Sequence, residues 1–415
     1  MVSEHTLVIL IAPNVGEQMG GEGIKALQIF REIKSLHPKT IQITHERNKA
    51  ELSGRLGISD VHYIPDTSVA LILWHSRVLR WLLNPWFCRK AVKLAELIAN
   101  QRGLTGTEAI IHQTEPNSPV MPRTVSKSHP NVFGPINGNI YYPKCFRSNE
   151  TLSARLRRVF HMPAQRINRF LFTGVTRANL ILCAGGTRTK QSLLAAGCSE
   201  NIIVDSLDCG ISDEILDRPR VEHIGQNLRF VHYGRLVFHK GTSLIVESLA
   251  KTQLPICLDV IGRGPELEPC RELVKELGLG DRVKFLDWFP SHADLLDSFG
   301  QYRGVVLPSI EDANGIVVQE SMAMGLPAIC LDWGGPQLLI QNEVSGYLIE
   351  PKSKDYITQK IAESLDKLAG NGELAEKFSR AAKQAAESWR WSQIIRAWIS
   401  LYSEYVTSKP SIVRQ

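Results

Sequence analysis

Short runs of apolar residues alternate along the chain with segments whose apolar residues recur every three or four positions. Short apolar runs are typical of buried parallel strands, and the wider spacing is typical of helices packed on one face. In the first half of the chain, five runs predict the strands Thr6 to Ala12, Ala109 to His112, Asn131 to Phe133, Leu180 to Ala184 and Ile202 to Ser206. In the second half, five more predict the strands Leu228 to Tyr233, Ile256 to Ile261, Val283 to Leu286, Gly304 to Leu307 and Ala328 to Leu331. The pattern predicts an α/β protein with two Rossmann-like parallel sheets.

The two series of strands are separated by Ser212 to Gly225, a charged segment with no sustained period of either kind. We therefore expect an N-terminal domain over residues 1–217 and a C-terminal domain over residues 218–390. From Trp389 to Val406 the apolar residues recur at helical spacing, which predicts an amphipathic helix in a C-terminal segment, residues 391–415. A length of 415 residues agrees with two domains, because a single core rarely organises so long a chain.

The composition is that of an ordinary globular protein, with 43% hydrophobic and 22% charged residues. A net charge of +6 is a mild excess for this length and does not indicate nucleic acid as a partner. Eight scattered cysteines without a C-x-x-C pair predict reduced thiols and no zinc site. Met1 to Pro13 lacks the pattern of a signal peptide, and no apolar run approaches the length of a membrane span, so we expect a cytoplasmic protein.

Polar or glycine-rich turns follow four strands of the second series, and the carboxyl ends of parallel strands form the usual ligand crevice. After the strand Leu228 to Tyr233, the turn begins with Gly234 and Arg235 and continues to Lys240. Two fixed cations at such a turn suit a diphosphate, since guanidinium offers forked donors and ammonium a compact charge. The alternative is an arginine and a lysine that merely flank a surface loop.

The strand that ends at Leu307 is followed by a polar loop and then by a helix that begins at Ile316. Backbone N–H groups near Asn314 and Gly315, at the helix start, form a ready anion site. Asp312 in the loop and Glu320 on the helix can accept hydrogen bonds from the hydroxyls of a sugar or ribose. Alternatively, Asp312 caps the helix and Glu320 is a solvated helix residue.

Two further turns are rich in glycine, which lets the backbone approach a ligand closely. They are Gly262-Arg263-Gly264-Pro265 and Trp333-Gly334-Gly335-Pro336, each directly after a predicted strand.

Four segments of the second half, Y-G-R-L-V-F-H-K-G, V-I-G-R-G-P-E-L, R-V-K-F-L-D-W and the run L-P-S-I-E-D-A-N-G-I-V-V-Q-E-S-M-A-M-G-L-P-A-I-C-L-D-W-G-G-P, resemble glycosyltransferase family 4 in sequence and in order. The resemblance implies the GT-B fold, two facing Rossmann-like domains with a cleft between them, and a C-terminal helix that packs back toward the N-terminal domain. It also implies a nucleotide diphosphate sugar as donor, retention of anomeric configuration, no metal ligand and no further cofactor.

By this resemblance, Asp312 and Glu320 stand at the two acidic positions of the family's E-x(7)-E motif, with aspartate in place of the first glutamate. Glu320 would then bind the donor ribose and Asp312 the hydroxyls of the transferred sugar, while Arg235 and Lys240 would stabilise charge on the leaving diphosphate. The predicted donor-binding residues are Gly20, Gly21, Gly234, Gly262, Arg263, Asn314, Gly315 and Ile316.

In the first half, Gly20 and Gly21 follow the first strand, where family members place a Gly-Gly pair; the alternative is a plain tight turn. His112 matches the first histidine of the family's H-x-H-x-P segment, in which a histidine faces the transferred sugar, while Thr114 replaces the second. Glu115 is an equal candidate for this role. The alternative for His112 is a polar cap on the core.

Two stretches combine aromatic and basic residues, as helices that lie on anionic membranes do. One is Trp74 to Lys93, with Arg77, Arg80, Trp81, Trp86, Arg89 and Lys90; the other is Arg155 to Phe172, with Arg157, Arg158, Arg166 and Arg169. An enzyme with a lipid-linked acceptor needs such contact with the inner face of the cytoplasmic membrane. The alternative is an ordinary amphipathic helix with a solvated basic face.

The sequence therefore predicts a retaining, metal-independent glycosyltransferase that acts on a saccharide or lipid-linked acceptor in bacterial polysaccharide or glycoconjugate biosynthesis. A catalytically silent nucleotide-sugar-binding subunit is an alternative, because Asp312 and Thr114 depart from the family pattern. A phosphorylase or epimerase on the same fold is another. A dinucleotide-dependent oxidoreductase is disfavoured, since no G-x-G-x-x-G follows the first strand.

Overall fold

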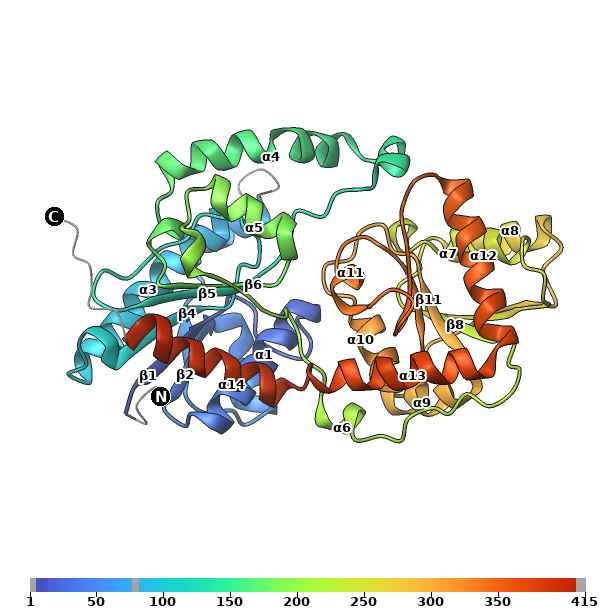
Figure 1. Ribbon diagram of the computed structural model, residues 1–415. Helices are drawn as coiled ribbons and strands as arrows, with labels where there is room; N and C mark the ends of the chain where they lie inside the picture. Colours follow the sequence, from blue (N-terminus) through green and yellow to red (C-terminus); the bar gives the residue numbers. More distant parts are fainter. Residues whose placement is uncertain (1–4, 77–81, 408–415) are drawn as a thin grey trace. The chain divides into compact units, whose positions relative to one another are not determined.

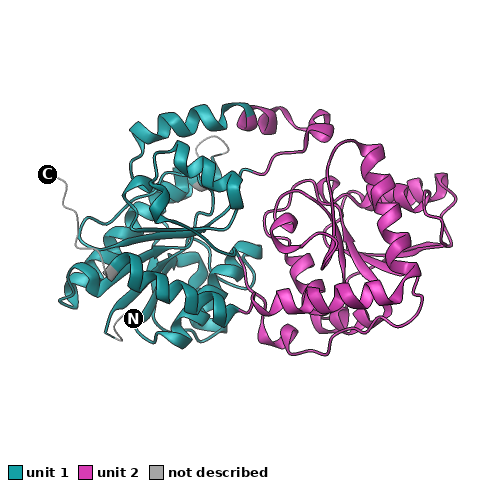
Figure 2. Cartoon of the chain, in the orientation of Figure 1, with its two compact units in different colours: residues 1–139, 159–208, 391–415 teal, residues 140–158, 209–390 magenta. Residues whose placement is uncertain are grey.

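The computed structural model of the protein describes residues 5–76 and 82–407 (Figure 1). The chain divides into two compact units (Figure 2). The first consists of residues 1–139, 159–208 and 391–415, and the second of residues 140–158 and 209–390.

Unit 1 is built on a parallel sheet of seven strands in the order β3-β2-β1-β4-β5-β6-β7. Its strands are β1 (Leu7–Ile11), β2 (Thr40–His45), β3 (Val61–Ile64), β4 (Ala109–Gln113), β5 (Asn131–Ile136), β6 (Leu180–Cys183) and β7 (Ile203–Asp205). Its helices are α1 (Gly20–Leu36), α2 (Ser68–His75), α3 (Leu83–Gln101), α5 (Gly186–Ala195) and α14 (Trp391–Tyr402). The boundary between the units falls within α4 (Leu152–Leu171).

Unit 2 is built on a parallel sheet of six strands in the order β10-β9-β8-β11-β12-β13. Its strands are β8 (Arg229–Tyr233), β9 (Cys257–Ile261), β10 (Val283–Leu286), β11 (Gly304–Leu307), β12 (Ala328–Leu331) and β13 (Gly346–Ile349). Its helices are α6 (Asp213–Leu216), α7 (Thr242–Leu249), α8 (Leu267–Glu276), α9 (His292–Asp297), α10 (Ile316–Ala323), α11 (Pro336–Leu339), α12 (Lys354–Gly370) and α13 (Gly372–Glu387).

The ten predicted strands are present, with bounds shifted by no more than a few residues, and β2, β3 and β13 are additional. The sequence did not predict β2, because its buried positions include Gln42 and Thr44, which interrupt the apolar pattern. Their amide and hydroxyl groups bond to the backbone carbonyls of Ile43 and Pro13. Polar side chains satisfied in this way are tolerated in a buried strand, but they look like loop residues in a sequence.

The helix predicted from Trp389 to Val406 corresponds to α14 and the short turn of π-helix that follows it. Trp398 and Tyr402 on this helix are almost fully buried. The Trp398 indole donates to the hydroxyl of Ser206 over 2.8 Å, and α14 also contacts α1. The C-terminal helix therefore returns to the N-terminal sheet, as the family resemblance implied.

The segment 140–158 interrupts unit 1 and belongs to unit 2 by its contacts. Phe146 lies in the hydrophobic core beneath β8 and β9, and the Trp333 indole donates to the Tyr141 carbonyl over 2.9 Å. The domain ranges expected from the sequence, with one boundary at residue 217, contain no such excursion. In the sequence this excursion is marked only by one aromatic residue that becomes buried, and a single residue forms no periodic pattern from which it could be predicted.

No helix within residues 5–76 and 82–407 is both long and apolar enough to cross a bilayer. In the predicted basic and aromatic stretch Trp74 to Lys93, residues 77–81 lie outside the described residues, and with them Arg77, Arg80 and Trp81. Trp86, in α3, is partly buried against the core of unit 1, while the neighbouring Arg89 and Lys90 are exposed. These contacts favour the ordinary amphipathic helix for α3.

We expect Tyr402→Phe to lower the free energy of unfolding by about 1–3 kcal/mol, because the change removes the hydroxyl that donates to Nδ1 of buried His112 over 2.6 Å. Chemical denaturation followed by tryptophan fluorescence measures the difference. Tyr356→Phe is the matched control, since the Tyr356 hydroxyl makes no hydrogen bond with the described residues. Equal stability of the two variants would contradict the structural role of the His112–Tyr402 contact.

Candidate functional site

The order of the second sheet reverses between β8 and β11, which lie side by side at its centre. At such a switch point the connections leave in opposite directions, so the carboxyl ends of the two strands border an open crevice. The turn after β8 carries Arg235 and Lys240, and the loop after β11 carries Asp312. The predicted cations and the predicted carboxylate therefore meet at one edge of the sheet.

Lys240 and Asp312 form an ion pair at this edge. The Lys240 ammonium donates to one carboxylate oxygen of Asp312 over 2.6 Å, and both side chains are mostly buried. The turn that carries Lys240 is held against the loop after β11 because Gly241, at a φ of 74°, packs directly on the Pro308 carbonyl. The ammonium has three N–H donors and uses one on Asp312, so further donors remain for a ligand.

The second carboxylate oxygen of Asp312 accepts hydrogen bonds from the backbone N–H of Gly315 over 3.0 Å and of Asn314 over 3.3 Å. The Asp312 carbonyl accepts from the N–H of Gly335 over 2.7 Å. A Cβ on Gly334 would lie 2.4 Å from that carbonyl, so the turn after β12 can approach this loop only with glycine there. Asp312 thus joins the start of α10, the turn after β12 and Lys240.

Helix α10 begins directly after Gly315, whose φ of 66° lies in the left-handed region that favours glycine. The positive end of the helix dipole is therefore next to the Lys240–Asp312 pair. Ile316, the first residue of the helix, remains 39% exposed and marks the edge that faces solvent. The N–H groups in the first turn of a helix have no partner within the helix, so this turn together with Lys240 suits an anionic group.

Glu320, one turn further along α10, contacts two aromatic side chains that the sequence analysis did not assign. One carboxylate oxygen lies 3.2 Å from the Tyr233 hydroxyl, and the other lies 3.3 Å from Nε2 of His292. Burial raises the pKa of Tyr233 well above its ordinary value, so its hydroxyl stays protonated and can donate. The hydrogen bond to Glu320 raises the pKa of His292. Glu320 is therefore held in place, with 15% of its side chain exposed.

His292 could have been found from the sequence. It begins α9, behind Ser291, which forms a capping box with Asp294 after β10. Residues that follow the carboxyl ends of parallel strands lie at the ligand crevice, and β10 is a predicted strand of the same series. The same rule therefore places the residues after β10, His292 among them, at this edge of the sheet.

The remaining predicted donor residues lie on neighbouring turns. Gly234 and Gly262 are in direct contact, since a Cβ on Gly262 would lie 1.9 Å from the Gly234 carbonyl. Arg263 is 70% exposed and is paired with Asp287. Arg235 is exposed, and its side chain has no hydrogen bond or ion pair with any of the residues that the structure describes. Arg235 is thus available to a ligand, whereas Arg263 has a partner in this structure.

In unit 1 the switch point lies between β1 and β4, and α1 begins there with Gly20 and Gly21. Both glycines are exposed, and a Cβ on either would meet nothing within 4 Å. The left-handed φ of 79° at Gly20 accounts for glycine at that position, but chain packing does not account for Gly21.

His112 is fully buried inside unit 1. Its Nε2 donates to the Gly134 carbonyl over 2.7 Å, so its Nδ1 is the acceptor for the Tyr402 hydroxyl. Burial lowers the pKa of His112 to about 4. Both ring nitrogens of a neutral histidine are therefore used within the core, which favours the polar cap over contact with a sugar.

Glu115 lies just beyond β4, at the carboxyl edge, and is only 2% exposed. Burial, followed by the nearby Glu22 carboxylate, raises the pKa of Glu115 to about 8, and one of its carboxyl oxygens has no hydrogen-bond partner among the described residues. Next to it, Lys25 and Asp208 form a buried ion pair at 2.9 Å. Of the two rivals, Glu115 is the one with unused hydrogen-bonding capacity.

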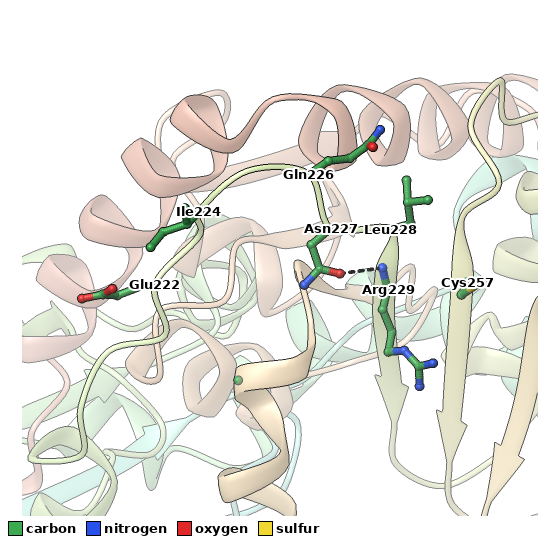
Figure 3. Close-up of a pocket in the computed structure, with 8 residues that line it drawn as sticks. Glu222, Ile224, Gln226, Asn227, Leu228, Arg229 and Cys257 are labelled. Atoms are coloured by element: carbon green, nitrogen blue, oxygen red, sulfur yellow. Dashed lines mark hydrogen bonds between the residues drawn. The ribbon is translucent and has the colours of Figure 1, made fainter.

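A hollow of about 570 Å³ opens elsewhere on unit 2 (Figure 3). Its lining includes Leu228 and Arg229 at the start of β8 and Cys257 at the start of β9. It therefore lies at the amino ends of the strands, opposite the edge with Lys240 and Asp312. Among the described residues, no group of three or more His, Cys, Asp or Glu side chains is arranged to hold a metal ion.

Two parallel Rossmann-like sheets, with polar turns at their carboxyl edges, define the GT-B class of fold. A solved structure of a glycosyltransferase from Rickettsia africae covers 97% of this chain, and 99% of that chain, with a TM-score of 0.65 at 15% identity. The structure of Anabaena Alr3699/HepE in complex with UDP covers 96% of this chain and 100% of that chain, with a TM-score of 0.62 at 15% identity. At this identity the likeness establishes the fold alone.

Residues 213–385 match the model of the family described as glycosyl transferases group 1. This match covers the segment that carries the four motifs, and it confirms their resemblance to a glycosyltransferase family. A relative from Mycobacterium tuberculosis, the GDP-mannose-dependent alpha-(1-6)-phosphatidylinositol monomannoside mannosyltransferase, is 28% identical over 185 residues, covering 41% of this chain. The match spans 46% of that relative, less than half of its length.

We expect the His292–Glu320 contact to stabilise the protein more in acid than in base. Because the pKa of His292 is raised by folding, the contribution is complete below the unfolded value of about 6.5 and is lost as the pH rises through the folded value. Thermal unfolding of His292→Gln should therefore differ from that of the native protein at low pH and converge with it at high pH.

His62→Gln is the matched control for this pH profile. Burial lowers the pKa of His62, so a native protein with this histidine loses stability in acid, and the variant should gain stability there. A His292→Gln difference that does not vary with pH would contradict an ionic contact with Glu320.

Proposed function

We propose that this protein transfers a sugar from a nucleotide diphosphate sugar to a saccharide or lipid-linked acceptor. The observation that carries the proposal is the Lys240–Asp312 pair at the start of α10, at the switch point of the second sheet. Lysine, a helix start and sugar-binding carboxylates are the chemical groups that a diphosphate sugar needs. The match of residues 213–385 to a glycosyltransferase family model supports the same conclusion.

In this proposal the diphosphate competes with Asp312 for Lys240. The donors available to it are the ammonium of Lys240, the guanidinium of exposed Arg235 and the backbone at the start of α10. Charge that develops on the leaving diphosphate is stabilised by groups already in place, which is where such groups contribute most to a rate. The carboxylate of Asp312, held by Lys240 and two backbone N–H groups, is oriented to accept from hydroxyls of the transferred sugar.

Glu320 is proposed to bind the donor ribose. Tyr233 and His292 fix its carboxylate in one orientation, and carboxylates accept well from vicinal hydroxyls. The proposal includes both uracil and guanine as the base of the nucleotide. The Anabaena protein was solved with UDP, while the mycobacterial relative is named for GDP-mannose.

We further propose that transfer proceeds with retention of configuration and without a metal ion, the fixed cations taking the place of the metal. The glycines at the start of α1 and buried Glu115 are the groups of the N-terminal domain that we assign to the substrates. A cytoplasmic role in bacterial polysaccharide or glycoconjugate synthesis fits a nucleotide sugar as donor.

Thermal unfolding in the presence of UDP-, GDP- and ADP-sugars tests donor binding, because a ligand at about 100 times its Kd stabilises by about 2.7 kcal/mol. We expect one nucleotide class to raise the unfolding temperature and the others to have no effect. The bound sugar nucleotide should then be consumed with an acceptor, also with a chelator present. Binding without turnover on a broad acceptor panel would favour a silent subunit, and no binding at all would refute the proposal.

Replacing Lys240 by alanine should lower kcat on the order of 100-fold, as for other preorganised charge stabilisers. The measurement is turnover of the donor found above. Lys251→Ala is the matched control, because Lys251 is also paired with an aspartate, Asp355, but lies outside the site. Near-normal turnover of the Lys240 variant, or an equal loss in both variants, would exclude the role given to Lys240.

A further inference from the structure

Helix α4, the long green helix of Figure 1, is amphipathic in the reverse of the usual sense: its polar side chains are the buried ones. His161 and Gln165 are its buried residues. His161 Nε2 bonds to the Ser192 hydroxyl over 2.8 Å, and the Gln165 amide donates to the Pro119 carbonyl over 3.1 Å. The helix is therefore anchored by hydrogen bonds rather than by an apolar face.

The apolar face of α4 is turned to solvent. Its most exposed large side chains are Leu152 (72%), Val159 (53%), Phe160 (59%), Ile167 (57%), Phe170 (79%) and Leu171 (67%). At 100° per residue they fall within about 120° of the helix circumference, so they share one face. A continuous apolar face of this kind is unusual on a protein surface and marks a site of contact with a partner or a membrane.

The charged residues of α4 itself all have one sign. Helix α4 contains five arginines and no acidic residue. Arg158 is paired with Glu150, whereas Arg155, Arg157, Arg166 and Arg169 are exposed. None of these four forms an ion pair within the described part of the chain. At 100° per residue, Arg155 and Arg166 fall on one flank of the apolar face and Arg157 on the other.

We propose that the outer face of α4 docks on an anionic lipid bilayer, with the apolar side chains in the interface and the arginines among the lipid headgroups. Arginines on the flanks can keep the guanidinium at headgroup level while their stems lie along the apolar layer. A second copy of the chain fits this face less well, because pairing two such faces would bring unpaired arginines together with no acidic group between them.

Docking through α4 holds the protein at the surface on which lipid-linked acceptors lie, and so selects that class over free saccharides. This choice of acceptor rests on the proposed transfer function, whereas the docking itself does not. The two are separable, since no residue of α4 has a part in the donor site of unit 2.

Flotation of the full chain with vesicles of phosphatidylglycerol and phosphatidylethanolamine tests the docking. We expect the protein to float with these vesicles at low salt, to stay behind with vesicles of phosphatidylcholine alone, and to be released by high salt. Arg155→Gln combined with Arg166→Gln, both on one flank of the apolar face, should weaken binding by ~10-fold or more, because each basic residue near an anionic surface contributes. Phe170→Glu combined with Leu171→Glu should abolish flotation.

Ile224→Glu is the matched control, because Ile224 is 84% exposed but lies outside α4. It should float as the native protein does, and all variants should keep the native unfolding temperature and the native turnover with a water-soluble acceptor. Loss of turnover in every assay, with flotation intact, would refute the transfer function but not the docking.

Three results would overturn the docking proposal. One is the absence of flotation with anionic vesicles at low salt. Another is flotation that the α4 variants do not change. The third is a dimer in analytical ultracentrifugation that the Phe170 and Leu171 variant dissociates, since the apolar face would then be an interface between copies.

Discussion

The carboxylate of Asp312 is the contact on which the geometry of the second unit's site depends. It bonds to the Lys240 ammonium on one side and to the backbone of Asn314 and Gly315 on the other, while its own carbonyl holds the turn at Gly335. Hydrogen bonds to a charged group are worth about 1.5–3 kcal/mol each, so together they offset part of the cost of ordering a polar loop. Without the Asp312 carboxylate, Lys240 in the turn after β8 would lose its hydrogen bond to the loop after β11.

This contact also shows that the two interpretations of Asp312 are compatible. A residue that caps the start of a helix and a residue that binds a sugar were set against each other as alternatives. In the structure one carboxylate oxygen orders the helix start and the other faces Lys240. The backbone hydrogen bonds fix the orientation of the Asp312 carboxylate and so the direction of its remaining lone pairs. A sugar hydroxyl can be recognised only by a carboxylate with a fixed orientation, so capping the helix does not compete with binding a sugar.

Buried polar side chains also hold helices in place in the first unit. His112 bonds at both ring nitrogens and ties β4 to α14, so the C-terminal helix is fixed to the N-terminal sheet by a specific contact in addition to the apolar area around Trp398. Helix α4 is anchored in the same manner through His161 and Gln165, which leaves its apolar side chains outward. Because polar side chains attach α4 to the rest of the protein, the apolar face of α4 stays exposed and is available for an interaction.

The local pattern determined the strands, the glycine turns and the order of the motifs, because apolar period and the need for positive φ are properties of a few adjacent residues. It therefore yielded the two sheets and brought Arg235, Lys240, Asp312 and Glu320 to one predicted edge. It missed β2, whose buried polar side chains find their hydrogen-bond partners only in the folded chain. The family resemblance made His112 and Glu115 equal candidates for a site residue, while the tertiary structure buried the His112 ring and left Glu115 with an unused oxygen. Only the tertiary structure decided three further features: the buried face of α4, the residue that contacts Glu320 from α9, and the unit to which residues 140–158 belong. Each of these features depends on contacts between segments that are distant in the sequence.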